Sequence, residues 1–323
     1  MTDSASLRQL KDAHFQSLRL GEKQPQKLYQ PMEYILSLKA KRMRPILTLL
    51  SYQVVSGRSF QEAMDLATAI ELFHNFTLMQ DEIMDRAPVR RGKASVHTVW
   101  DENVAILSGD ALFAYSIGLV GKGFPGLAFQ LTQEFSNVSL LVCEGQQEDM
   151  DLADKEEVCI EDYLEMIRKK TATLLGACMS MGAMAAKAEM SLVEKFREFG
   201  EAMGLAFQLQ DDLMDAFPPQ NFGKQIGGDI LERKKTYLYL KALELADPSS
   251  KDMLMSLYRE PGGTDGKVEE VLTIFRNLDV KQHTEKLIQH YFESARTIGT
   301  QIAEQVDFNP IKTYLQEISK RKW

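Results

Sequence analysis

Residues 72–85 read LFHNFTLMQDEIMD, and residues 206–215 read AFQLQDDLMD. In both stretches apolar side chains recur at spacings of three and four, which is the period of a helix with one buried face. The same period precedes the first stretch at Leu66, Ile70 and Phe73. No alternating strand pattern of useful length competes with it anywhere in the chain. The sequence therefore predicts an all-α fold.

Glycine and proline mark the ends of the predicted helices. They gather at 121–126, 217–228 and 260–266, where we expect loops. Pro45 follows the basic run KAKRMR at 39–44, and proline is favoured in the first turn of a helix. Cations grouped at the amino end of a helix, where the backbone N–H groups are unpaired, favour the binding of an anion.

Composition limits the class of protein. The 323 residues carry 38 Lys and Arg against 46 Asp and Glu, a net charge of −8, which argues against nucleic acid as a partner. Three scattered cysteines and the lack of a secretory signal predict a cytoplasmic protein. We identify 174–186 as the most apolar stretch, shorter than the ~20 residues of a membrane span, so no transmembrane segment is expected. No linker is evident, so we expect a single domain over residues 1–323.

The two opening stretches each end in an acidic cluster. Asp81 and Asp85 are four residues apart, as are Asp211 and Asp215, with Asp212 beside them. Carboxylates at this spacing share a helical face and repel one another. A hard divalent cation such as Mg²⁺ would relieve the repulsion. One cluster alone is equally consistent with a solvated acidic face, whereas two matching clusters favour a metal site.

Basic residues follow both acidic clusters. Arg90 and Arg91 come after the first, and the loop GKQIGGD with Lys224, then Lys234, comes after the second. Carboxylate-bound metal beside cations suits a diphosphate, because the metal bridges phosphate oxygens and the cations bind the remaining charge. Each basic run taken alone could be a solvated charge run. No GxxxxGK[ST] loop occurs, which disfavours a nucleotide kinase.

These motifs, together with KKT at 169–171, resemble in content and order those of the trans-isoprenyl diphosphate synthases, the polyprenyl synthetase family. The resemblance covers roughly residues 41–236. It implies the isoprenoid synthase fold, a bundle of long antiparallel helices around a deep central cavity, and a homodimer. It also implies head-to-tail condensation of isopentenyl diphosphate with an allylic diphosphate, giving geranylgeranyl or farnesyl diphosphate.

The resemblance assigns roles by position. Mg²⁺, expected as three ions, is bound by Asp81, Asp85, Asp211, Asp212 and Asp215. The allylic diphosphate and its reacting carbon are contacted by Arg90, Lys170, Thr171, Gln208, Lys224 and Lys234. Isopentenyl diphosphate is bound by Lys41, Arg44, His74 and Arg91. Product length is set by Phe76 and Thr77. Phe76 implies a short product, and twenty carbons are favoured over fifteen. Without the resemblance, His74 and Phe76 would be read as core residues.

One departure from the family pattern is Glu82, where an aspartate is usual. We expect it to orient Arg90 rather than to bind metal. The basic run at 320–322 resembles a tail that closes over the isopentenyl site in some members, although a solvated helix end is the simpler interpretation. The alternatives are a class I terpene cyclase, a head-to-head synthase, or a non-catalytic regulatory subunit of the same fold.

Overall fold

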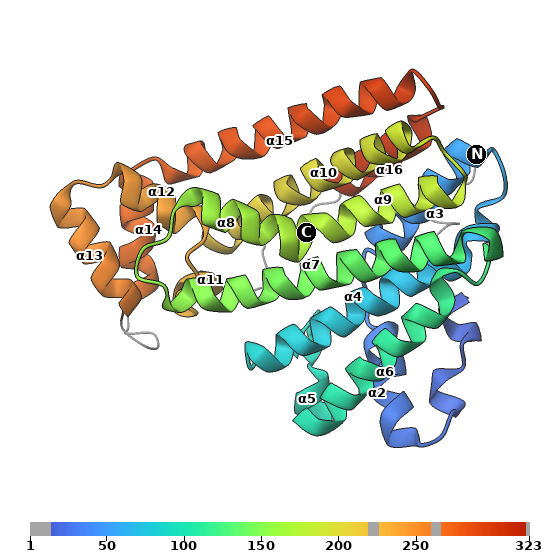
Figure 1. The fold of residues 1–323 in the computed structure, drawn as a ribbon. Helices are drawn as coiled ribbons and strands as arrows, with labels where there is room; N and C mark the ends of the chain where they lie inside the picture. The colour runs from blue at the N-terminus through green and yellow to red at the C-terminus, as the bar shows by residue number, and fades with distance from the viewer. Residues whose placement is uncertain (1–13, 219–225, 260–265, 321–323) are drawn as a thin grey trace. The chain divides into compact units, whose positions relative to one another are not determined.

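A computed structural model describes residues 14–218, 226–259 and 266–320 of the chain. These residues are almost entirely helical (Figure 1), and the strands among them are the two short strands of one hairpin. The prediction of an all-α fold is therefore confirmed. Lys224 and most of the basic run at 320–322 lie outside the described residues.

The first half of the chain contains short 3₁₀ turns, the hairpin and five helices of more than ten residues. In order, the elements are η1 (Leu20–Glu22), α2 (Gln26–Ser37), α3 (Met43–Ser56), η2 (Phe60–Ala63), α4 (Met64–Met84), β1 (Val89–Arg90), β2 (Lys93–Ala94), α5 (Val96–Val99), α6 (Glu102–Val120), η3 (Pro125–Leu127) and α7 (Ala128–Asp154).

The second half begins with a helix that widens into a π turn. Its elements are α8 (Ile160–Ile167), the π turn η4 (Arg168–Ala172), α9 (Thr173–Ala185), α10 (Met190–Ala216), α11 (Gly228–Leu231), α12 (Tyr237–Leu245), α13 (Pro248–Arg259), α14 (Lys267–Asn277), α15 (Val280–Ala303) and α16 (Asn309–Lys320).

The chain folds into two compact units. Among the described residues, unit 1 comprises 14–137, 177–196 and 302–320, and unit 2 comprises 138–176, 197–218, 226–259 and 266–301. The single domain over residues 1–323 and the deep central cavity remain predictions.

Unit 1 is built on the packing of α4 against α6 (Figure 1). Gly109 of α6 allows the two helices to approach, because a Cβ there would lie 3.0 Å from the Nε2 of Gln80. Beside it, Phe76 stacks on Phe113 with ring centroids 5.1 Å apart and planes at 12°. Phe73 contacts both rings. The aromatic residue expected to limit product length is thus held in an aromatic cluster.

Unit 2 is organised around the π turn. A Cβ on Gly145 of α7 would lie 2.3 Å from the backbone nitrogen of Lys170, and one on Gly204 of α10 would lie 2.5 Å from the Cα of Ala172. Only glycine leaves room for such close approaches. Wide turns of this kind are frequent at functional sites, and this one contains two residues singled out in the sequence, Lys170 and Thr171.

Two expectations from the sequence, a buried helix and a loop, are confirmed. The apolar stretch at 174–186 forms α9, with Leu174 and Leu175 buried, as predicted. Among the described residues α6 is the one helix whose length and composition would allow a membrane crossing, and a helix packed in a soluble protein can meet the same criterion. The loop predicted at 121–126 is present as a turn and the short η3.

Candidate active site

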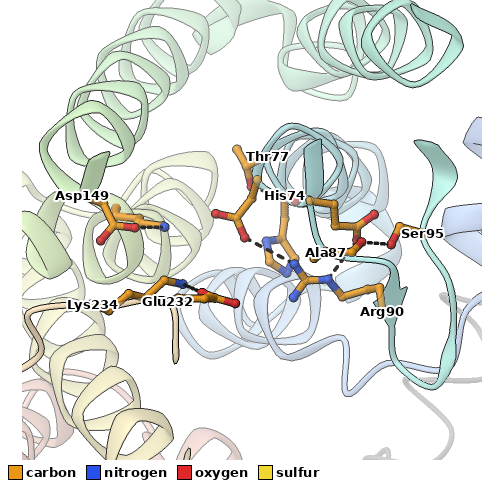
Figure 2. A network of polar contacts seen from close by, with 11 residues as sticks. His74, Thr77, Ala87, Arg90, Ser95, Asp149, Glu232 and Lys234 are labelled. Atoms are coloured by element: carbon orange, nitrogen blue, oxygen red, sulfur yellow. Dashed lines mark hydrogen bonds and ion pairs between the residues drawn. The ribbon is translucent and has the colours of Figure 1, made fainter. Parts of the chain in front are cut away.

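In unit 1, the helix α4 presents most of the predicted site residues. His74, Phe76, Thr77 and Asp81 lie along it, and Asp85 is the residue that caps its carboxyl end. Thr77 donates its hydroxyl proton to the backbone oxygen of His74, 2.8 Å away (Figure 2). The side chain of Thr77 is thus fixed one turn from the acidic end of the helix.

The hairpin after α4 positions two arginines. Arg91 and Gly92 form its two-residue turn with φ values of 52° and 73°, which is the left-handed geometry typical of tight hairpins. Arg90 reaches back to α4 (Figure 2), where its Nε donates to Glu82 at 2.9 Å and its Nη2 to Asp81 at 3.3 Å. Glu82 therefore holds Arg90, which is the contact expected from the sequence.

A cluster of cations surrounds His74. The Nη1 of Arg44, at the start of α3, lies 3.1 Å from the Nε2 of His74. Because arginine can only donate, Nε2 must accept and the ring proton must be on Nδ1. Burial, followed by the charges of Arg44 and Arg91, lowers the pKa of His74 well below its usual value. The histidine is therefore neutral at physiological pH.

The same cluster contains unused donors. The Nε of Arg44 and the Nη1 of Arg91 are buried without a hydrogen-bond partner. Burial, followed by the nearby Arg42 charge, lowers the pKa of Arg91 to about 10. Buried, mutually repelling guanidinium groups with free donors are a site for an anion. Lys41, which precedes Arg42 at the same helix end, is half-buried.

The sequence did not identify what holds this cluster in place. Arg42 is buried with φ 52° at the start of α3, and its Nη1 lies 2.5 Å from an oxygen of Glu71 on α4. Its Nη2 donates to the backbone oxygens of Leu36 and Leu38. The pair fixes the backbone between Lys41 and Arg44. No local pattern marks the pairing, because the two residues are 29 positions apart.

In unit 2, helix α10 carries the second acidic cluster. Asp211 is exposed, Asp212 is buried and Asp215 is half-buried. Asp215 accepts hydrogen bonds from the backbone nitrogens of Gly228 and Asp229, each at 3.1 Å. Burial, followed by the charges of Asp212 and Asp215, raises the pKa of Asp229 well above its usual value. Asp229 thus belongs to this cluster, although the sequence pattern gave it no role.

The cations of unit 2 lie beside carboxylates. Lys170 is 2.6 Å from Asp149 of α7, and Lys234 is 3.0 Å from Glu232 (Figure 2). Thr171 and Gln208 are also brought together, with 2.9 Å between the hydroxyl and the amide oxygen. Asp149 was missed because it lies in a generally acidic segment of the sequence, EGQQEDMD at 144–151, which resembles a solvated face.

The aspartates of the two acidic clusters are suited to bind Mg²⁺ together with the phosphate oxygens of a substrate. Among the residues that the structure describes, no three His, Cys, Asp or Glu side chains form a cluster able to hold a metal by themselves. Mg²⁺ commonly uses one or two carboxylates and completes its shell with substrate phosphates and water. Burial raises the pKa of Asp212 to about 6, with the charge of Asp211 adding to the rise. A cation would stabilise this carboxylate.

Comparison with known proteins identifies the family. The family model for polyprenyl synthetases matches residues 25–275. The chain is 32% identical to a geranylgeranyl pyrophosphate synthase of Geoglobus acetivorans, over 93% of this chain and 91% of that protein. It is 36% identical to a short chain isoprenyl diphosphate synthase of Methanocaldococcus jannaschii, over 77% and 76%.

Solved structures agree with the sequence comparison. A geranylgeranyl pyrophosphate synthase crystal structure superposes with a TM-score of 0.90 at 38% identity, covering 97% of this chain and 96% of that one. The corresponding enzyme of Pyrococcus horikoshii superposes with a TM-score of 0.87 at 29% identity, covering 97% and 96%. The expected isoprenoid synthase fold is confirmed. The chain belongs to the polyprenyl synthetase family of transferases.

Proposed function

We propose that this enzyme condenses isopentenyl diphosphate with an allylic diphosphate, head to tail, to give a short-chain prenyl diphosphate. The short-chain and geranylgeranyl synthases among its relatives support this assignment. The observation that carries it is the pair of unused buried donors on Arg44 and Arg91 beside a neutral His74. Such a cluster of donors suits a diphosphate that binds without metal, as isopentenyl diphosphate is expected to do.

The allylic diphosphate is assigned to the carboxylates. Family members generally use Mg²⁺, which when bound neutralises charge on the departing diphosphate. Asp81 and Asp85 of unit 1 would bind Mg²⁺, and so would Asp211, Asp212 and Asp215 of unit 2. Three ions is our proposed number. In unit 2, Lys170 and Lys234 form ion pairs with Asp149 and Glu232. When the substrate binds, the two ammonium groups would exchange these carboxylates for phosphate oxygens.

The chemistry follows from these groups. The allylic carbon–oxygen bond breaks and its electron pair leaves with the diphosphate. The double bond of isopentenyl diphosphate supplies the electrons of the new carbon–carbon bond, and a proton then passes to the released diphosphate. Oxygen dipoles of Thr171 and Gln208, fixed before the reaction, stabilise the positive carbon, because preorganised dipoles need no reorientation as charge develops.

A homodimer is supported by helix α6. Ile106, Leu107 and Ile117 on this helix are 39%, 60% and 44% exposed. Ile106 and Ile117 are eleven residues apart, three helical turns, and so share a face. An exposed apolar face of this kind indicates an interface. Light scattering after gel filtration should give twice the mass of the chain, and Leu107→Glu should reduce it to that of one chain.

The assignment is tested by incorporation of labelled isopentenyl diphosphate with geranyl or farnesyl diphosphate as primer. His74→Ala should raise KM for isopentenyl diphosphate roughly 10- to 100-fold, the loss of a hydrogen bond to a charged group. KM for the primer should change little. His290→Ala, at an exposed position on α15, is the matched control. Equal losses for both substrates would contradict the pocket assignment.

The rival functions give different results in the same assay. A terpene cyclase or head-to-head synthase would consume an allylic diphosphate without isopentenyl diphosphate. A regulatory subunit would consume neither. Either result would overturn the proposed condensation.

A further inference from the structure

Four side chains of unit 2 form a continuous chain of hydrogen bonds. The hydroxyl of Thr171 in the π turn lies 2.9 Å from the Oε1 of Gln208 on α10. The Nε2 of Gln208 lies 2.9 Å from one oxygen of Asp212. The other oxygen of Asp212 accepts from the hydroxyl of Tyr163 on α8. The proposed condensation gives Tyr163 no role.

The direction of every hydrogen bond in this chain is determined by chemistry. An ionised carboxylate can only accept, so the NH₂ group of Gln208 must face Asp212. The amide oxygen of Gln208 therefore faces Thr171. Between two oxygens only the hydroxyl carries a proton, so Thr171 must donate to Gln208. The single proton of Thr171 is thereby used, and its oxygen can offer only lone pairs to any other group.

Tyr163 fixes the far end of the chain. Its side chain is buried, with 1% exposed. Its hydroxyl faces a carboxylate, which has no proton to offer, so Tyr163 must be the donor of this hydrogen bond. Each oxygen of Asp212 accepts one of these two hydrogen bonds, and the carboxylate cannot rotate without losing both.

We propose that Tyr163 is a positioning residue for the allylic ionisation step: through Asp212 and Gln208 it commits the hydroxyl proton of Thr171, so that Thr171 presents lone pairs to the carbon that becomes positive. If the amide of Gln208 turned over, its NH₂ group would face Thr171 and the hydroxyl proton would be free to point at that carbon. A proton there would oppose the developing charge, whereas lone pairs stabilise it. This inference rests on the proposed function.

The test is a double-mutant cycle on the single-turnover rate of condensation. Tyr163→Phe removes only the hydroxyl, and Thr171→Val removes the oxygen with little change in shape. We expect Tyr163→Phe to reduce the rate about tenfold, the effect of one lost hydrogen bond, with KM for isopentenyl diphosphate unchanged. In the Thr171→Val background the same substitution should reduce the rate less than twofold, because no threonine proton remains to be directed.

Controls separate this role from a general effect on folding. Tyr239→Phe removes the hydroxyl of another buried tyrosine of the unit 2 core and should leave the rate unchanged. If Tyr163→Phe does not fold, as judged by thermal melting, Gln208→Leu breaks the chain at a half-buried position. In the Gln208→Leu background Thr171→Val should then have little further effect.

Four results distinguish the possible failures. If the tenfold loss caused by Tyr163→Phe persists in the Thr171→Val background, or if Tyr239→Phe causes the same loss, the positioning role is refuted. An increase in KM for isopentenyl diphosphate alone would refute it too. If the unmodified enzyme forms no condensation product, the proposed function itself fails.

Discussion

Removing Glu71 should destabilise the protein far more than removing a surface carboxylate. Only 5% of the Arg42 side chain and 2% of the Glu71 side chain are exposed, and 2.5 Å separates their charged groups. Glu71→Ala would leave Arg42 charged and buried, with hydrogen bonds only to the backbone oxygens of Leu36 and Leu38. Loss of one partner of such a pair costs about 3 to 5 kcal/mol.

The thermal effect follows from chain size. With an unfolding entropy of about 2.1 cal/mol/K per residue, the 323 residues give roughly 0.7 kcal/mol/K if the chain unfolds as one unit. A loss of 3 to 5 kcal/mol then lowers Tm by roughly 4 to 7 °C. Circular dichroism during heating and during urea titration measures both quantities.

A surface pair provides the matched control. Arg276 and Glu269 lie 2.7 Å apart with 51% and 68% of their side chains exposed, so Glu269→Ala should cost less than about 1 kcal/mol. Replacing both Arg42 and Glu71 by leucine should recover much of the loss, since no buried charge remains. If Glu71→Ala costs no more than Glu269→Ala, Arg42 is not held as described, and the explanation of how α3 begins is wrong.

Two further predictions concern helix α4. The pKa of His74 is lowered in the folded state, so between that pKa and about 6.5 the unfolded chain binds more protons than the folded chain. The free energy of unfolding should therefore rise with pH across this window and then level off. Urea titrations from pH 5 to 8 should show a shallower rise for His74→Gln, and an equal rise would refute the lowered pKa. Phe76→Ala removes the ring stacked on Phe113. The first condensation should continue, and the product should be longer by one or more isoprene units. An unchanged distribution of product lengths on chromatography would show that Phe76 only packs the core.

Much of the site could be predicted because its pattern is local. The i, i+4 spacing placed Asp81 and Asp85 together at the end of one helix, and Pro45 marked the start of α3, which runs from Met43. Glu82 was expected to contact Arg90 and does so. Each of these relations spans fewer than ten residues, so the backbone geometry of one element determines it.

The contacts that hold the site in place are not local. Asp212 and Tyr163 are 49 residues apart in sequence, and the direction of the hydrogen bonds between them depends on a complete set of partners. The hairpin turn at Arg91 was also missed, because RRG was interpreted only through the charges of its two arginines and not as a backbone that requires positive φ at two positions. Such relations depend on tertiary packing, which periodicity does not encode.

The π turn at Arg168–Ala172 also constrains how this sequence can be recombined with its relatives. A chimera that kept the residue count but closed the wide turn into regular α-helix would rotate everything after it by about one residue's 100° relative to α8. Leu174 and Leu175, now buried, would turn away from their present neighbours. Gene-shuffling crossovers should therefore take α8, the π turn and α9 together from one parent, even where the sequences on either side are freely exchanged.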